Sequence, residues 1–232
     1  DCGGSCTLVC SSEALPPVSR FEPRIFEVIP GLYSLLAQVE NHNINYEAPH
    51  VSYQFKIYDE SNNLLYTREG VTTISKNKVT SIFEGNILLA KKPKRAELEL
   101  GRIVWQRLNT EEPKIEIRNS PLLRQDSAPR IEAEVENKSL YEVRDIELIA
   151  LIYDSRDNIV ASSRTYIDKL AKDGTTDVFF TWPKAFDLGV VSCEAPSSVL
   201  LAIDRSGSMS ALSLNPPEPL TSVKGAASSF VS

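Results

Sequence analysis

The feature that most constrains the fold of this chain is an internal repeat. Residues 35–41 read LLAQVEN, and residues 131–137 read IEAEVEN. Each block is followed by a longer segment that ends in Ile-Tyr-Asp, at residues 57–59 and at residues 152–154. The two copies are 96 residues apart by the first block and 95 by the second. A period of this size matches one β-sandwich domain, so the sequence predicts a tandem array of two such domains.

The residue pattern inside each copy is typical of strands. One segment of the first copy alternates apolar with polar residues, in the order Val51, Ser52, Tyr53, Gln54, Phe55, Lys56 and Ile57. This period of two buries one side of a strand and leaves the other side in water. Helical periodicity is absent from residues 21–190, so the body is predicted to be all-β. The expected core includes Val51, Phe55, Ile57, Ile146, Leu148 and Ile152.

The repeat and its flanks predict four segments. Residues 1–20 are an N-terminal segment that contains three cysteines. Residues 21–108 and 109–190 are the two predicted sandwiches, and both begin with a Glu-Pro pair that suits the entry to a strand. Residues 191–232 are predicted to contain a strand, a loop and a helix, because apolar residues near the end recur with helical spacing. These helix positions are Val223, Ala226, Ala227, Phe230 and Val231.

Composition excludes several classes of function. The net charge of −6 offers no basic surface for nucleic acid or for anionic lipid. No apolar run reaches the roughly 18–20 residues that a membrane-spanning helix needs. The chain has only two histidines, and neither a nucleophile–base set nor a phosphate-binding glycine loop is present. We therefore expect a protein without enzymatic activity, and the start at Asp1 suggests a processed product or a fragment.

The four cysteines predict disulfides in an oxidising compartment. Three of them lie at Cys2, Cys6 and Cys10, and the fourth is Cys193. Their connectivity stays open, because four cysteines allow three pairings. A zinc site is less favoured, since the spacing is not that of paired zinc ligands. The three N-terminal cysteines could instead belong to a reduced tail, or one of them could carry a lipid anchor.

The body of the chain resembles the bacterial FxLYD-type modules, which are immunoglobulin-like sandwiches. The resemblance is carried by Val-Glu-Asn at residues 135–137, by Ile-Tyr-Asp at residues 152–154, and by the strand that follows the next turn. It covers residues 112–183 well and residues 22–108 more loosely. It implies an extracytoplasmic spacer or interaction module without catalytic residues. The competing interpretation is a generic sandwich that happens to share the pattern.

A second resemblance begins at the apolar strand of residues 199–203. The segment that follows reads Asp204-Arg205-Ser206-Gly207-Ser208, and the predicted helix comes after it. A strand, a D-x-S-x-S loop and a helix look like the start of a von Willebrand factor A domain. The resemblance implies a metal-ion-dependent adhesion site in which Ser206 and Ser208 coordinate Mg²⁺, while Asp204 ligates the metal or holds a water. These hard oxygen donors suit Mg²⁺.

The competing interpretation of this loop is a Ser- and Gly-rich turn whose Asp satisfies backbone donors. The remaining ligands of the family, a Thr and an Asp on later loops, are expected beyond Ser232. Asp204, Ser206 and Ser208 alone are therefore expected to bind Mg²⁺ weakly or not at all.

We expect a secreted or cell-surface protein that binds a protein partner or self-associates. The sandwiches are predicted to form a stalk or spacer for an adhesion-type A domain. A second hypothesis is a subunit of an extracellular filament that assembles by strand addition between modules. The strand of residues 199–203 is expected to pair with a sandwich edge of its own chain or of a neighbour, because five consecutive apolar residues would otherwise promote aggregation.

Overall fold

The structure, a computed structural model, describes residues 15–107, 112–119, 122–124, 126–154, 156–186 and 199–204. Across these ranges the regular secondary structure consists of strands, which confirms the predicted all-β body. None of the described residues forms a helix long and apolar enough to cross a membrane. The strands of the first repeat are β1 (Val18–Ser19), β2 (Arg24–Ile29), β3 (Leu32–Glu40), β4 (Tyr46–Tyr58), β5 (Leu64–Ile74), β6 (Val79–Leu88), β7 (Arg95–Leu100) and β8 (Gln106–Arg107). Those of the second are β9 (Ile115–Asn119), β10 (Arg130–Asn137), β11 (Val143–Tyr153), β12 (Ile159–Leu170), β13 (Thr175–Thr181) and β14 (Val199–Asp204).

Each repeat folds into two antiparallel sheets that face each other. In the first repeat, β3 lies between β2 and β6, and β4 lies between β5 and β7. The short strands β1 and β8 add to β3 and β4. In the second repeat, β10 lies between β9 and β13, and β11 lies between β12 and β14. Buried apolar side chains fill the space between the two sheets of each repeat. We call the repeats sandwich 1 (β1–β8) and sandwich 2 (β9–β14).

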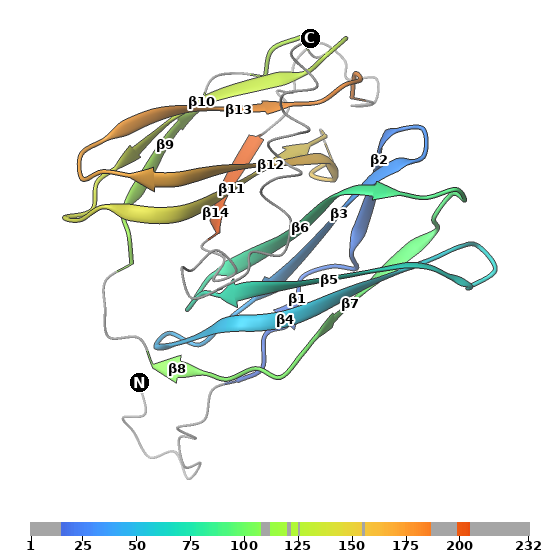
Figure 1. Cartoon of the computed structure of the whole chain (residues 1–232), viewed down its shortest axis with the longest axis horizontal. Coiled ribbons are helices and arrows are strands. Elements are labelled where there is room, and N and C mark those ends of the chain that lie inside the picture. The colour runs from blue at the N-terminus through green and yellow to red at the C-terminus, as the bar shows by residue number, and fades with distance from the viewer. Residues whose placement is uncertain are drawn as a thin grey trace.

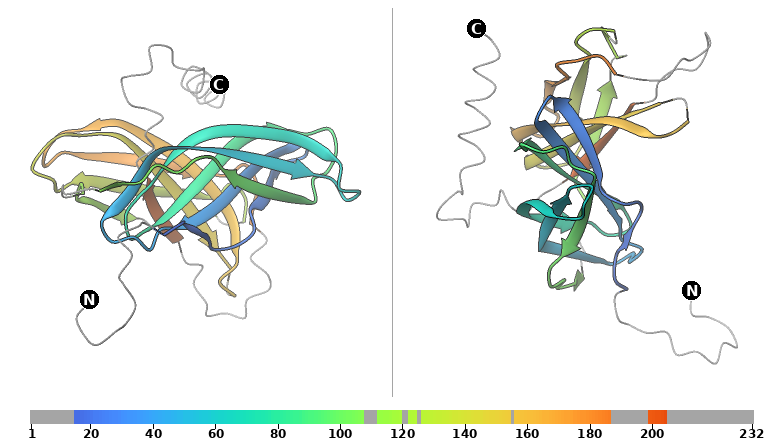
Figure 2. Two further views of the ribbon diagram at one scale, coloured as in Figure 1. Left: turned by 90° about the horizontal axis from the view of Figure 1, so that it is seen from below. Right: turned by 90° about the vertical axis from the view of Figure 1, so that its right-hand side faces the viewer.

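The four sheets are stacked as layers (Figure 1). The β5–β4–β7 sheet forms one outer layer and the β9–β10–β13 sheet forms the other (Figure 2). In the middle, the sheet that contains β3 and β6 faces the sheet that contains β11 and β12. A third apolar cluster lies there, with buried side chains from both sandwiches. The described residues therefore form three apolar layers, one inside each sandwich and one between the sandwiches.

The expected core residues are confirmed in both sandwiches. The six predicted side chains are exposed by 2% or less, and they are Val51, Phe55, Ile57, Ile146, Leu148 and Ile152. Each sandwich also encloses a fully buried phenylalanine, Phe55 in sandwich 1 and Phe180 in sandwich 2. The alternation of apolar and polar residues therefore predicted correctly which side of β4 faces the core.

The repeated asparagine of the Val-Glu-Asn block has the same structural role in both sandwiches. The side-chain amide of Asn137 is buried and donates to the backbone oxygens of Tyr141, Leu170 and Ala171 at 2.8–3.0 Å. In sandwich 1 the Asn41 amide donates to two backbone oxygens at 2.8 and 3.0 Å. In each case one buried side chain joins backbone oxygens from two separate segments at the end of the sandwich.

Replacing Asn137 with Ala is expected to lower the free energy of unfolding by about 2–3 kcal/mol, because the substitution removes three hydrogen bonds donated by a fully buried amide. Urea denaturation measures the change. Asn158→Ala is the matched control, since the Asn158 amide donates to Asp154 at the exposed turn of the same sandwich. This control is expected to cost less than about 1 kcal/mol. Equal losses for the two variants would show that Asn137 does not have the proposed role.

The repeated Asp of the Ile-Tyr-Asp block organises the turn that follows it. Asp154 Oδ1 accepts hydrogen bonds from the backbone N–H groups of Arg156 and Asn158 at 2.9 and 2.8 Å. Asp59 accepts the equivalent bonds in sandwich 1 at 3.0 and 2.8 Å. The side-chain amides of Asn63 and Asn158 also donate to these carboxylates. These side-chain bonds, and after them the backbone bonds, hold the pKa of both aspartates below the usual value. The Asp of the repeated Ile-Tyr-Asp motif thus stabilises the turn after the strand in both copies.

The last strand, β14, completes sandwich 2. It pairs antiparallel with β11, and Val199 lies opposite Ile152. In sandwich 1, β7 holds the same place on β4, where Ala96 lies opposite Ile57. Since Ile57 and Ile152 are equivalent residues of the repeat, β14 is the structural counterpart of β7. The prediction that this strand pairs with a sandwich edge is confirmed, and the edge belongs to its own chain.

The predicted strand, loop and helix of the C-terminal segment are described only as far as Asp204. The strand is present, but it lies in an antiparallel sheet of sandwich 2 and not in a sheet of its own. The D-x-S-x-S loop beyond Asp204 and the helix expected at residues 221–232 lie outside the described residues. The α/β part of the predicted fold stays a prediction.

Candidate functional site

Of the predicted metal ligands, only Asp204 belongs to the described residues. It is the last residue of β14, and it lies opposite Glu147 of β11 in the backbone register. Ser206 and Ser208 lie outside, and so do the disulfide candidates Cys2, Cys6, Cys10 and Cys193. Within the described part of the chain, no group of three or more His, Cys, Asp or Glu side chains is arranged to hold a metal. The metal site and the disulfides therefore stay predictions.

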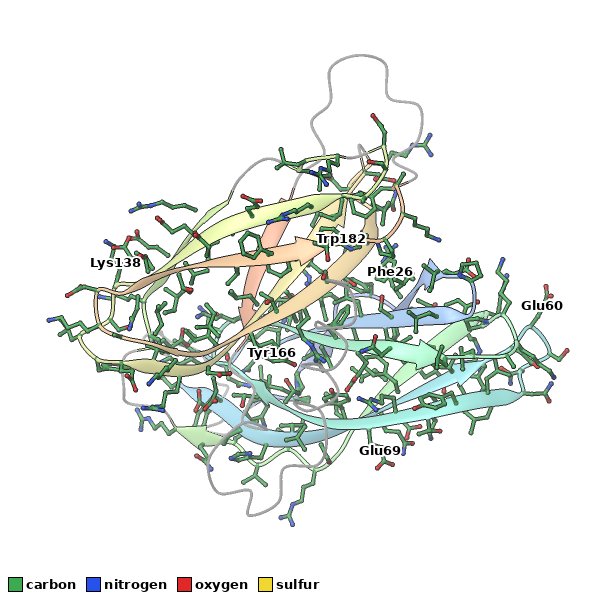
Figure 3. All side chains as sticks on the ribbon, turned by 45° about the horizontal axis from the view of Figure 1, so that its top comes forward. Phe26, Glu60, Glu69, Lys138, Tyr166 and Trp182 are labelled. Carbon is green, nitrogen blue, oxygen red and sulfur yellow. The ribbon has the colours of Figure 1, made fainter. Side chains whose placement is uncertain are left out.

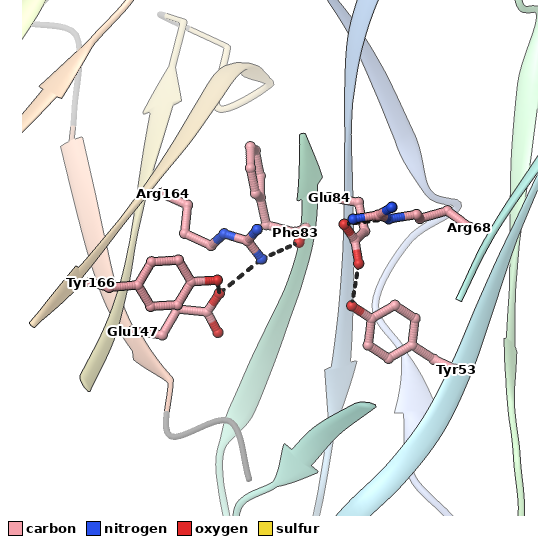
Figure 4. Close-up of polar contacts among 7 residues, drawn as sticks. All are labelled: Tyr53, Arg68, Phe83, Glu84, Glu147, Arg164 and Tyr166. Carbon is pink, nitrogen blue, oxygen red and sulfur yellow. Dashed lines mark hydrogen bonds and ion pairs between the residues drawn. The ribbon is translucent and has the colours of Figure 1, made fainter. Parts of the chain in front are cut away.

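The main polar site of the structure is a buried ion pair of sandwich 2 that lies at the interface with sandwich 1 (Figure 4). Arg164 of β12 donates a hydrogen bond of 2.8 Å from Nη1 to the backbone oxygen of Phe83 on β6 of sandwich 1. The same nitrogen lies 3.1 Å from Oε1 of Glu147, and the Tyr166 hydroxyl donates to that oxygen at 3.0 Å. The Glu147 and Arg164 side chains are 7% and 20% exposed. Figure 3 shows Tyr166 at the level where the two sandwiches meet.

A second buried carboxylate lies on the neighbouring residue of β6. The hydroxyl of Tyr53 donates to Glu84 Oε1 at 2.7 Å, and Arg68 Nε donates to Glu84 Oε2 at 3.0 Å (Figure 4). Glu84 follows Phe83, whose backbone oxygen accepts from Arg164. The two networks are thus joined through β6, and both carboxylates have the hydrogen-bonded partners that buried charges require.

A glycine makes room for the tyrosine in this second network. Gly70 of β5 lies opposite Tyr53 of β4. A Cβ atom at Gly70 would lie 2.3 Å from the Tyr53 hydroxyl oxygen, which is too close for a carbon and an oxygen that are not bonded. Burial raises the pKa of Tyr53, and the charge of Glu84 raises it further, so the hydroxyl keeps the proton that it donates.

The apolar part of the interface surrounds the ion pair. Leu36 and Phe83 project from sandwich 1, and Ile149, Leu151 and Ile159 meet them from sandwich 2. The Arg164 guanidinium lies 5.2 Å from the centroid of the Phe83 ring, a geometry that favours a cation–π contact. The interface thus combines a dry apolar patch with directional polar bonds, and such a combination favours one relative orientation of the sandwiches.

On the sandwich 2 side, the residues that face the interface differ from the residues at the equivalent positions of the first repeat. Ile149 and Leu151 of β11 correspond to Gln54 and Lys56 of β4, which lie on the outer face of sandwich 1. Lys56 forms an ion pair of 2.6 Å with Glu99 there. The same position of the repeat is therefore apolar where it is covered and charged where it meets water.

The same change occurs in the opposite direction on the sandwich 1 side. Leu36 of β3 is fully buried in the interface, and its counterpart on β10 is Glu132. The outer face of sandwich 2 carries further ion pairs, in which Arg118 lies 3.3 and 3.0 Å from Glu134 and Glu136. In the described part of the chain, each repeat thus carries fully buried apolar side chains on the outer face that meets the other sandwich and ion pairs on the opposite outer face.

The interface was missed by the sequence analysis, although β11 carried a signal for it. Residues 148–152 are five consecutive apolar residues, whereas residues 53–57 of the first repeat alternate. A continuous apolar run is typical of a strand that is covered on both faces. The run indicates that a second layer covers β11, but it does not identify which sheet provides that layer.

A shallow groove of about 250 Å³ lies on sandwich 1, away from the interface. Its walls carry charges of both signs, from Glu22, Glu27, Lys92, Lys94 and Arg95. Residues 92–95 of the basic run contribute one wall, and most of them lie in the connection before β7. Opposite charges so close to each other favour mutual pairing and mark no single class of ligand.

The stability of the protein is expected to depend on pH through Glu147. Burial raises the pKa of this carboxyl, although Arg164 and Tyr166 lower it. A raised folded-state pKa means that the folded protein binds the proton more tightly than the unfolded chain does. The contribution of Glu147 to stability is therefore lost as the pH rises through its folded-state pKa, and it is restored on acidification towards the ordinary value of 4.5.

Glu147→Gln removes this titration. We expect the stability of the wild type, relative to that of the variant, to rise as the pH falls from about 7 to about 5. Urea denaturation of both proteins across this range measures the difference. Asp154, whose lowered pKa has the opposite effect on stability, is present in both proteins, so its contribution cancels. A difference that stays constant with pH would contradict the raised pKa.

No protein-family model matches the sequence, and no curated protein matches it either. Among solved structures, the chain is similar to the crystal structure of red sea bream transglutaminase at 9% identity and a TM-score of 0.26. The match covers 81% of this chain and 29% of that chain, so this chain spans less than a third of that protein. A likeness this weak carries no argument, and the function has to be argued from the residues.

Proposed function

We propose that the chain is a non-catalytic extracellular or cell-surface protein whose sandwiches, of the immunoglobulin-like FxLYD type, act as a stalk for an adhesion-type A domain. One observation carries the proposal. The two sandwiches are packed on each other through the buried contact between Arg164, Glu147 and the Phe83 backbone. A pair of modules held in one orientation transmits position and force between its ends, whereas a pair joined by a free linker does not.

The connection between the sandwiches supports the same proposal. β8 pairs with the start of β4, so the chain stays on sandwich 1 as far as Arg107. Glu112, beyond the residues that follow β8, forms an ion pair with Lys78 of sandwich 1. Lys114 then donates its backbone N–H to Ser139 Oγ of sandwich 2 at 2.8 Å. The connecting segment is thus attached on both sides, which restricts hinge motion.

The A domain would follow sandwich 2, and its metal site, which begins at Asp204 where β14 ends, is part of the proposal. Asp204, Ser206 and Ser208 supply oxygen donors of the kind that Mg²⁺ prefers. Three ligands from one loop leave most of the octahedron to water, so weak binding is expected. Calorimetric titration with Mg²⁺ measures it, and loss of binding in Asp204→Ala would assign it to this loop.

Labelling of intact cells of the source organism tests the location. Lys91, Lys92 and Lys94 are exposed on one turn of sandwich 1. A membrane-impermeant amine reagent is expected to label them before the cells are lysed. Labelling only after lysis would contradict a surface location, and labelling of a cytoplasmic control protein would show that the cells leak.

Replacing residues 15–203 in the native protein by a flexible Gly/Ser linker of equal reach tests the stalk, because the proposed metal ligands Asp204, Ser206 and Ser208 are kept. Adhesion is expected to fall, and an unrelated rigid pair of sandwiches is expected to restore it. Equal adhesion with either insert would contradict a role for a fixed orientation.

The second candidate function is assembly into an extracellular filament by strand addition. The observation that favours it is that β14, whose sequence is an apolar run, fills the edge of a sheet in sandwich 2. A strand at such a position can be donated to another molecule without rearrangement of the rest of the fold.

A further inference from the structure

We propose that the β11 edge of sandwich 2 is a strand-accepting site, and that residues 199–204 of a second copy of this chain occupy it by exchange. The proposal rests on the second candidate function, strand addition, and names its donor and acceptor. In the structure β14 fills the site from the same chain. The exchanged form would keep every backbone pair of β11 with β14 and change only the chain that supplies the strand.

The acceptor edge requires an occupant. β11 contributes fully buried side chains to two apolar clusters, the core of sandwich 2 and the interface with sandwich 1. Residues 148–152 are all 0% exposed. An unfilled edge at this strand would expose backbone donors and acceptors beside both clusters. The site therefore selects an extended, apolar segment of about six residues, which is the length of β14.

The connection before β14 is longer than the closure of its own sandwich requires. In sandwich 1, six residues join the end of β6 at Leu88 to the start of β7 at Arg95. In sandwich 2, seventeen residues join the end of β13 at Thr181 to the start of β14 at Val199. Both connections join equivalent strands, so the shorter one shows what closure needs. Seventeen residues span up to about 55 Å when extended, which is enough to reach a neighbouring molecule.

The register makes the site selective. Ala150 lies opposite Leu201, and Leu151 lies opposite Leu200. A slip by one residue would turn every side chain of the donor to the other face of the sheet. Reciprocal exchange between two copies gives a closed dimer, whereas exchange in one direction gives an open chain of molecules.

The test uses full-length chains in which Cys2, Cys6, Cys10 and Cys193 are replaced by Ser. One variant carries Ala150→Cys, and another carries Leu201→Cys. Directly opposed residues of antiparallel strands are close enough for a disulfide. The two variants are mixed at high concentration, exposed briefly to mild denaturant, returned to native conditions and oxidised. Mass spectrometry under non-reducing conditions is expected to find a dimer that contains one chain of each kind.

Two further variants make the outcome decisive. A mixture of Ala150→Cys and Leu200→Cys, which is out of register by one residue, is expected to give at least about tenfold less crosslinked dimer. A single chain with both Ala150→Cys and Leu201→Cys is expected to close its own disulfide, which shows that the edge is present and filled. If that chain closes while the first mixture yields only monomers, the site does not accept a second copy and the proposal is wrong.

Sedimentation of the wild type separates this proposal from the filament function. Crosslinked dimers without larger assemblies would support strand exchange and contradict the filament. Long assemblies without the heterodimeric crosslink would support a filament that forms by other contacts and contradict the exchange. Failure of the double-cysteine chain to close would overturn the pairing of β11 with β14, and with it the proposal.

Discussion

Arg164→Met is expected to lower the free energy of unfolding by about 3 kcal/mol. Removing one partner of a buried ion pair leaves the other charge without compensation, which typically costs about 3–5 kcal/mol. The Arg164 side chain keeps 20% exposure, so the lower end of the range applies. The variant also leaves the Phe83 backbone oxygen without its donor from sandwich 2. Urea denaturation measures the loss.

Two controls identify the cause of this loss. Adding Glu147→Gln to Arg164→Met is expected to recover most of the stability, because the neutral amide no longer buries a charge and still accepts from Tyr166. Arg118→Met is the surface control, since the Arg118 side chain is 64% exposed in its ion pairs. It is expected to cost at most about 1 kcal/mol. If Glu147→Gln deepened the loss of Arg164→Met, the ion pair would not be its source.

Removing β14 is expected to have the largest effect of all. A chain that ends at Pro196 lacks the strand opposite residues 147–152 of β11 and opens both the core of sandwich 2 and the interface. Losing a whole strand should cost more than about 4–5 kcal/mol, the level at which single substitutions become exceptional. For a chain of this size that is a fall in Tm of at least about 10 °C.

A chain that ends at Met209 is the matched control, because it keeps β14 and loses only residues that follow it. Its Tm is expected to stay within about 2 °C of the wild type, which corresponds to less than about 1 kcal/mol. Thermal unfolding followed by circular dichroism compares the three chains. An unchanged Tm in the chain that ends at Pro196 would show that β14 does not contribute to the fold.

The repeat, the strands and the core were predictable because each depends on local pattern. The alternation at residues 51–57 placed Phe55 inside. The proline at residue 23 directly precedes β2, and the proline at residue 113 comes shortly before β9, as expected for strand entry. The run of apolar residues at 199–203 predicted a partner edge, because unpaired apolar strands are unstable.

The interface was not predictable in the same way, since its contacts are between residues far apart in sequence. Arg164 and Phe83 are 81 positions apart, and nothing in either segment identifies the other as its partner. From the sequence alone, an Arg on β12 and a Glu on β11 are interpreted as an ordinary ion pair on the solvent-exposed face of a sheet. Only the fact that β11 is covered on both faces makes them a buried pair.

The repeated motifs illustrate a second limit. Asn41 and Asn137 stood out in the sequence because they recur, and the structure gives them hydrogen bonds to loop carbonyls. Recurrence identifies what both sandwiches need to fold. The residues that distinguish the sandwiches, such as Ile149 against Gln54, determine how the two are arranged.

A distance measurement between the sandwiches tests the central claim, that they form one stack in a fixed orientation. Spin labels at Glu60→Cys on sandwich 1 and Lys138→Cys on sandwich 2 lie on opposite sides of the molecule (Figure 3), and they are introduced in a background without the native cysteines. Double electron–electron resonance is expected to give a single narrow distribution, as narrow as that of the control pair Glu60→Cys and Glu69→Cys within sandwich 1. A broad distribution for the first pair beside a narrow one for the control would mean two sandwiches on a flexible tether, and would contradict the account.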